Sequence, residues 1–139
     1  MTSETVLVPI NVGSETDRAA LFAQLAERAG RGATIVFMTV VPEIYLATDT
    51  DPKGTIEAMQ EHAGVLLAAV AEAAPFKVDR QVVRYGPVAP AILDVAGEIG
   101  ATLILINARQ KGRAVAYALG SVASRVANHA HCSVTVLRH

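Results

Sequence analysis

Three basic side chains lie close together in the last third of this 139-residue chain, at Arg109, Lys111 and Arg113. A Gly120-Ser121 pair follows them along the chain. Fixed cations attract an anion, glycine lets the backbone approach it closely, and a hydroxyl can donate a hydrogen bond to phosphate. These residue types predict a site for a small anion. The alternative is a solvated basic loop followed by a pair that only caps a helix.

The charges of the chain are divided unevenly. Through Glu98 there are seven Lys or Arg and thirteen Asp or Glu, whereas from Ile99 onward there are five Lys or Arg and no acid. The net charge of the whole chain is −1, and the excess of positive charge that could attract an anion lies in its C-terminal third. With three Phe, three Tyr and no Trp, the chain has few rings on which nucleobases of a polymer could stack. We therefore expect no nucleic-acid partner.

The residue patterns of common catalytic machineries are missing from the sequence. The motifs GxxxxGK[ST], GxSxG and GxGxxG do not occur. Cys132 is the single cysteine, which excludes an intrachain disulfide and a four-cysteine zinc site. His129 and His131 stand where a predicted helix passes into a predicted strand, and they need not face the same way. We therefore predict no catalytic residue and no metal site.

Hydrophobic patterning divides the chain into strands and helices. Apolar residues at helical spacing predict helices at about 15–29, 53–74, 90–99 and 120–130. The first helix would be capped by Ser14 with Asp17 in its first turn, and the second by Thr50 or Asp51. Continuous β-branched runs are typical of strands buried on both faces of a parallel sheet. They predict strands at Thr5–Asn11, Ala33–Val41, Ala101–Asn107 and Ser133–Leu137, and the less apolar segment Lys77–Val82 predicts a strand at the edge of the sheet.

This alternation predicts an α/β fold of the Rossmann-like kind. We expect a doubly wound, five-stranded parallel sheet of order 3-2-1-4-5, with helices on both faces. The length fits one domain, 1–139. In this order the first and fourth strands are neighbours whose following helices leave to opposite faces, and ligands bind beyond the carboxyl ends of such strands. The predicted site therefore lies in a crevice between residues 11–14 and residues 108–121.

Two further expectations concern location and assembly. The N-terminal residues lack a basic segment followed by a long apolar core, and no apolar stretch is long enough to span a membrane. We therefore expect a soluble, cytoplasmic protein without a membrane partner. The last strand is apolar and has no Lys or Pro to block edge pairing. We expect a homodimer in which this strand pairs with its copy, with Val134 and Val136 at the interface.

The order of elements and four sequence signatures resemble the universal stress protein family over essentially the whole chain. The resemblance implies an adenine nucleotide alpha hydrolase-like domain that dimerises, often binds ATP or AMP, is connected with stress survival, and has no established common reaction. The signatures are Val6–Asn11 with Gly13-Ser14, Val83–Pro87, Leu119–Val122, and Asn128–Arg138.

The same resemblance implies roles for individual residues. Asn11 would lie near the ribose, and the backbone around Val40 and Val41 would contact adenine. This chain has Asn11 where the family has an acid, and Asn107 and Gln110 where the family has glycines; its loop is closer to that of one bacterial subgroup. ATP or AMP, with or without Mg²⁺, would have its phosphates surrounded by Ala108, Arg109, Lys111, Arg113, Gly120, Ser121 and Val122.

Two other functions stay open. The chain could be a dimeric stress protein that has lost nucleotide binding and acts through an unidentified protein partner. It could also be a slow ATPase or an adenylate-transferring enzyme. Release of a nucleotide from the purified protein on acid extraction would favour nucleotide binding over its loss.

Overall fold

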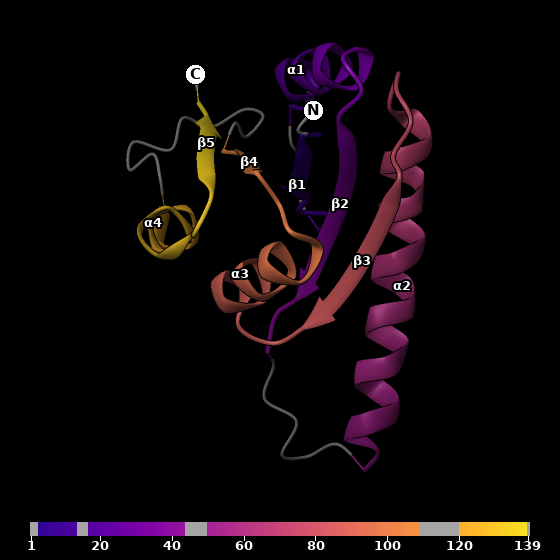
Figure 1. Cartoon of the computed structure of the whole chain (residues 1–139). Helices are drawn as coiled ribbons and strands as arrows, with labels where there is room; N and C mark the ends of the chain where they lie inside the picture. The colour runs from indigo at the N-terminus through magenta and orange to yellow at the C-terminus, as the bar shows by residue number, and fades with distance from the viewer. Residues whose placement is uncertain (1–2, 14–16, 44–49, 109–119, 139) are drawn as a thin grey trace.

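The structure, a computed structural model, describes residues 3–13, 17–43, 50–108 and 120–138. Its strands form one parallel sheet of order β3-β2-β1-β4-β5, as predicted (Figure 1). Every neighbouring pair in this sheet needs a crossover connection, which the helices supply. The strands are β1 (Thr5–Pro9), β2 (Thr34–Val41), β3 (Arg80–Tyr85), β4 (Leu103–Asn107) and β5 (Ser133–Leu137).

Four helices cover the sheet in two layers. Helices α1 (Ala19–Gly30) and α2 (Pro52–Ala73) lie on one face, and α3 (Val88–Ile99) and α4 (Gly120–His129) lie on the other (Figure 1). The helices that follow β1 and β4 thus leave to opposite faces, which makes the carboxyl ends of these two strands the switch point of the fold. No helix in the described ranges is both long and apolar enough to cross a membrane.

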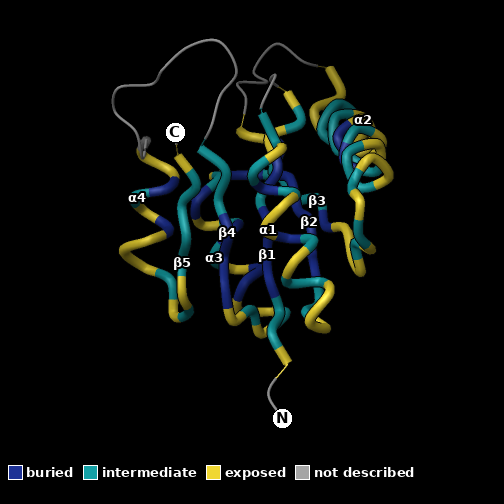
Figure 2. The backbone as a smooth tube through the Cα atoms, turned by 90° about the horizontal axis from the view of Figure 1, so that it is seen from above, coloured by how far each residue is buried: buried dark blue, intermediate teal, exposed yellow. Residues whose placement is uncertain are grey.

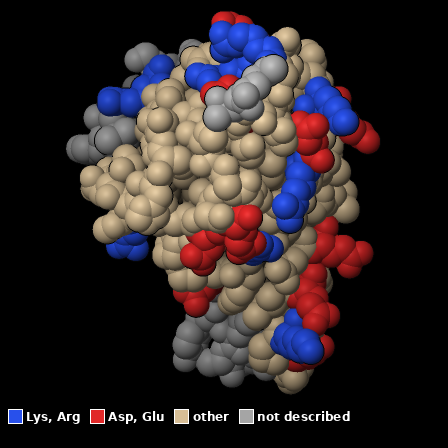
Figure 3. Space-filling model, viewed as in Figure 1, with Lys and Arg blue, Asp and Glu red and all other residues tan. Residues whose placement is uncertain are grey.

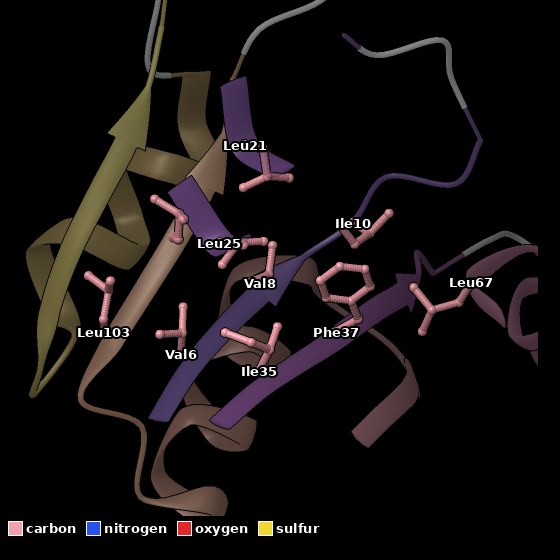
Figure 4. Close-up of a cluster of buried hydrophobic side chains, with 10 residues drawn as sticks. Val6, Val8, Ile10, Leu21, Leu25, Ile35, Phe37, Leu67 and Leu103 are labelled. Carbon is pink, nitrogen blue, oxygen red and sulfur yellow. The ribbon is translucent and has the colours of Figure 1, made fainter. Parts of the chain in front are cut away.

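The core lies on both faces of the central strands because their side chains alternate in direction. Val6 and Val8 of β1 join Phe37 of β2 in the cluster under α1 and α2 (Figure 4). Leu7 of β1 and Ile104 of β4 join the cluster under α3 and α4. The central strands are therefore buried along most of their length (Figure 2), which explains why their sequences are continuously apolar.

Two of the predicted helix starts are wrong. The first helix begins at Ala19, and Asp17 precedes it, with its Oδ1 accepting a hydrogen bond from the Ala19 N–H at 3.1 Å. Ser14, the predicted cap, lies outside the described residues. The third helix begins at Val88 rather than Pro90. Pro90 lies in the first turn, where N–H groups have no partner within the helix, so the missing N–H of proline does not prevent the helix from beginning before it.

The third strand is displaced toward the C-terminus of its predicted range. It was expected at Lys77–Val82 and runs over Arg80–Tyr85. Asp79 explains the late start, because its carboxylate accepts the Ile35 N–H at 2.8 Å and so takes the place of a strand carbonyl. The strand continues to Tyr85 because Val82 packs toward α3 while Val83 packs toward α2.

The second helix begins close to its predicted start. Pro52 occupies its first position, and the Asp51 side chain accepts a hydrogen bond from the Gly54 N–H at 3.2 Å. The predicted capping by Asp51 is thus confirmed. This helix packs on β2 and β3, and its exposed residues contribute to the charged margin on that side of the molecule (Figure 3).

Candidate functional site

The carboxyl ends of β1 and β4 lie side by side, because these strands are paired from Val6 with Leu103 and Leu7 with Ile104. Asn11 and Gly13 follow β1, and Ala108 follows β4. Helix α4 begins at Gly120, and in a parallel α/β unit the connecting helix starts at the same edge where its preceding strand ends. The fold therefore brings the predicted residues Asn11, Ala108 and Gly120 to one edge of the sheet.

Asn11 has a defined local geometry. Its Oδ1 accepts a hydrogen bond from the Gly13 N–H at 3.0 Å, which closes a turn directly after β1. A carboxamide oxygen has two lone pairs, so this bond leaves one for a further donor such as a ribose hydroxyl. The side chain is exposed and is therefore accessible to a ligand.

Asn107 ties the two sides of the switch point together. Its Nδ2 donates a hydrogen bond to the Asp17 carbonyl oxygen at 2.9 Å, which connects the end of β4 to the segment before α1. Sequence reasoning treated Asn107 only as a departure from a glycine pattern. The structure gives it a positive role, since the bond holds the segment before α1 against the end of β4.

Arg18 is a cation at this edge that sequence reasoning missed. Its Nη2 donates a hydrogen bond to the Asn11 carbonyl oxygen at 3.1 Å, and burial lowers the pKa of its guanidinium from the ordinary value. The residue immediately precedes α1, where the helix already has a partial positive charge. No carboxylate among the described residues forms an ion pair with Arg18. An anion bound nearby would therefore stabilise the positive charge of Arg18, which is partly removed from water.

Arg18 had a signal in the sequence. A basic residue that follows the first strand and lies next to the start of the first helix is expected at the switch point. The signal was lost because the helix was predicted to begin at residue 15, which placed Arg18 inside it rather than at its entrance.

Val40 and Val41 at the end of β2 have backbone groups that could contact a ligand. Val41 is buried, and its carbonyl accepts a hydrogen bond from the Gly86 N–H at 2.9 Å, so this carbonyl points toward β3. Backbone groups alternate in direction along a strand, and the Met38 carbonyl accepts the Ile10 N–H at 2.7 Å. The N–H and C=O of Val40 therefore point to the side of β2 on which β1 lies. The pairing of β1 with β2 ends at Pro9 and Met38, so Val40 lies beyond the last pair.

The first turn of α4 presents Ser121 and Val122 at the surface. Both are exposed, and Val122 is one of two large hydrophobic residues that are exposed in the described part of the chain. The first N–H groups of any helix lack partners within it, so this turn provides hydrogen-bond donors. The predicted basic residues Arg109, Lys111 and Arg113 lie outside the described residues.

Residues that could support metal or thiol chemistry lie elsewhere. His129 and His131 are exposed, and within the described ranges no three His, Cys, Asp or Glu side chains are grouped so that they could hold a metal ion. Cys132 is half-buried against the cluster under α3 and α4, and burial raises the pKa of its thiol. At neutral pH this cysteine therefore remains a thiol, the less nucleophilic form.

These features define a doubly wound α/β domain whose switch point has the first turn of a helix, an exposed amide oxygen and a half-buried cation that pairs with no carboxylate in the described part of the chain. A family model described as the universal stress protein family matches residues 2–138, and the chain belongs to this family.

Solved structures agree with this fold. The chain is similar to the universal stress protein UspA from Lactobacillus plantarum, with 26% identity, a TM-score of 0.73 and 99% of each chain covered. It is also similar to a universal stress protein solved in complex with cAMP, with 20% identity, a TM-score of 0.58, and 99% and 98% covered. A third similar structure is the universal stress protein from Archaeoglobus fulgidus in complex with dAMP, with 22% identity, a TM-score of 0.56, and 99% and 100% covered.

Proposed function

We propose that this chain is a cytoplasmic stress-response regulatory protein that binds an adenine nucleotide, ATP or AMP, at the switch point between β1 and β4. The observation that carries this proposal is the arrangement at the ends of β1, β2 and β4, where Asn11, the Val40 backbone and the first turn of α4 share one edge. Complexes of similar proteins with cAMP and dAMP support adenine nucleotides as the ligand class.

We assign the base contact to Val40 rather than to the carbonyl of Val41. The Val41 carbonyl is already bonded to Gly86, whereas the backbone of Val40 faces the space beyond the end of β1. Adenine has both a donor and an acceptor on one edge, which suits a backbone N–H and C=O. The contact uses no side-chain chemistry, so substitution of Val40 by other apolar residues would preserve it.

The sugar would lie over the turn after β1. The Asn11 side chain is exposed there, and its Oδ1 can accept a ribose hydroxyl in addition to the Gly13 N–H. A neutral amide is a weaker acceptor than a carboxylate, so this contact contributes modestly to affinity. Asn11→Asp should strengthen it.

The phosphates would lie between the end of β4 and the start of α4. Ala108 and the N–H groups of Gly120, Ser121 and Val122 would surround them, because a helix N-terminus stabilises negative charge. Arg109, Lys111 and Arg113 would supply cations from the intervening loop, and Arg18 would add one from the β1 side. A bound triphosphate would carry Mg²⁺ on its own oxygens.

Thermal unfolding in the presence of nucleotide tests this proposal. If Kd is near 10 μM, millimolar ATP should stabilise the native state by roughly 2.7 kcal/mol. Gly120→Val should remove this shift relative to its own ligand-free melting temperature, because a side chain there blocks close approach of the phosphate. Val65→Ala, at an exposed position on α2, is the matched control and should retain it. Equal shifts for wild type and Gly120→Val would place the nucleotide elsewhere.

We also propose that the protein is a homodimer through β5. The two sheet margins differ, because β3 has Arg80, Gln81 and Arg84 whereas β5 has no charged residue. Charged residues discourage pairing of an edge strand with another chain. The Leu137 carbonyl accepts the Ala108 N–H at 2.9 Å and so points to β4. By alternation, the backbone groups of Val134 and Val136 point to the free edge, where a second copy can pair with them.

A further inference from the structure

Thr39 is the one polar residue that is buried in the described part of the chain, with 4% of its surface exposed. Its hydroxyl forms no hydrogen bond with any described residue. A buried hydroxyl without a partner lowers stability, because it loses its hydrogen bonds to water and gains none in return. Valine has nearly the same shape and no hydroxyl, so it would avoid this penalty. Threonine at this position is therefore explained if a bound ligand supplies a hydrogen-bond partner for the hydroxyl.

The surroundings of Thr39 are apolar. It lies on the same face of β2 as Phe37 and Val41, under α1 and α2, with Val83 of β3 beside it in register. Ile10 lies on its other side at the end of β1, in the same cluster as Phe37 (Figure 4). None of these neighbouring side chains has a polar atom that could bond the hydroxyl.

Helix α2 brings small residues to this part of the sheet. Ala63 is buried, and a Cβ built on Gly64 would lie 3.7 Å from Cγ2 of Val83, the register partner of Thr39. A larger residue at position 64 would press on the strand pair next to Thr39. At these two positions the helix therefore adds no polar group beside Thr39.

Thr39 also lies next to the proposed base site. It directly precedes Val40, whose backbone faces the space beyond β1, and it is level with Ile10, where β1 has just ended. A base that contacts the Val40 backbone would therefore lie next to the residue that carries this hydroxyl. Ligand sites commonly combine apolar walls with a few polar groups that fix orientation.

We propose that the Thr39 hydroxyl hydrogen-bonds the base of the bound nucleotide, which makes Thr39 a specificity-determining residue of the site. The inference rests on the proposed nucleotide binding and goes beyond it by naming a side chain that contacts the base. A hydroxyl both donates and accepts, so it can bond either a ring nitrogen or the exocyclic amino group of adenine.

The test compares Thr39→Val with wild type in two measurements. Thr39→Val should raise the denaturant midpoint of the ligand-free protein, since it removes an unpartnered buried hydroxyl. It should also weaken binding of ATP and AMP roughly three- to tenfold by calorimetry, since one hydrogen bond to the ligand is lost. Thr39→Ser should restore much of the affinity. Thr34→Val, the same change at the opposite end of β2, is the control and should leave the affinity unchanged.

The possible failures are distinguishable. If wild type binds ATP and Thr39→Val binds it equally well, the hydroxyl does not contact the base and the inference is wrong while the proposed function stands. If Thr39→Val lowers the stability of the ligand-free protein, the hydroxyl has an internal partner such as a buried water, and the inference is again wrong. If wild type binds neither ATP nor AMP, the proposed function fails and this inference fails with it.

Discussion

At the scale of single residues, the switch point is organised by hydrogen bonds that a motif comparison does not show. Asn107 connects the end of β4 to the segment before α1, and Arg18 bonds the Asn11 carbonyl. Asn107 bonds a backbone atom that is distant in the sequence. Arg18 bonds the backbone from a position that was predicted to lie inside the first helix. Such contacts depend on the three-dimensional placement of β1 beside β4, so sequence alone could predict the location of the site but not these two roles.

Asn107→Ala tests the structural role of the amide. Loss of the bond to the Asp17 carbonyl should lower the free energy of unfolding by about 1 kcal/mol, because the variant lacks this part-buried hydrogen bond. Asn128→Ala, at an exposed position on α4, should change it by less than about 0.5 kcal/mol. Chemical denaturation of both variants provides the comparison, and equal stabilities would show that Asn107 does not hold the segment before α1 against β4.

Cys132 gives a prediction that depends on pH. Burial raises the pKa of its thiol, so the folded state holds this proton more tightly than the unfolded state does. The stabilising contribution is complete below the unfolded pKa of about 8.5 and is lost as the pH rises through the folded value. At pH 8 iodoacetamide should modify the native protein more slowly than the urea-unfolded chain. Equal rates would show that the thiol is not protected.

At the scale of elements, strand and helix types could be predicted from hydrophobic patterning, but several ends could not. The fifth strand has its predicted bounds, whereas the third is displaced because the Asp79 carboxylate replaces a backbone acceptor. The first helix starts late because Asp17 bonds the Ala19 N–H from outside it. These two errors arise where a side chain competes with the backbone for a hydrogen bond, which residue propensities do not describe.

The start of α2 can be tested with two substitutions. Asp51→Ala should cost about 1 kcal/mol, since it removes the side-chain acceptor for the Gly54 N–H. Gly54→Ala should be nearly neutral, because its Cβ would collide with Asp51 Oδ2 and displace the cap, while alanine favours the helix by up to about 1 kcal/mol. Asp51→Ala should then cost little in the Gly54→Ala background. Additive effects in thermal unfolding would argue against this competition.

At the scale of the whole molecule, two sheet margins of different character determine how copies can associate. Side chains of the charged margin at β3 and α2 are visible in Figure 3, whereas β5 offers outward backbone groups at Val134 and Val136. The side chain of Val134 packs against the cluster under α3 and α4, so a lysine there would disturb the core as well as the edge. Proline is the better probe, because it removes only a backbone donor.

Val136→Pro should give a folded monomer. The N–H of residue 136 points to the free edge, so its loss leaves the pairing of β5 with β4 intact. Thr135→Pro removes a donor that points to β4 and should lower stability instead. Light scattering after size exclusion distinguishes the two states, and a dimeric, stable Val136→Pro variant would place the interface elsewhere.

The central claim is that an adenine nucleotide binds at the switch point, and calorimetric titration of the purified wild-type protein with ATP, ADP and AMP in the presence of Mg²⁺ tests it most directly. We predict a dissociation constant in the micromolar range, on the order of −7 to −8 kcal/mol, with the triphosphate favoured and its advantage reduced by salt. Asn11→Asp should bind more tightly and Gly120→Val should not bind. The absence of measurable heat for all three nucleotides at millimolar concentration would contradict the account and favour a protein that acts through partners alone.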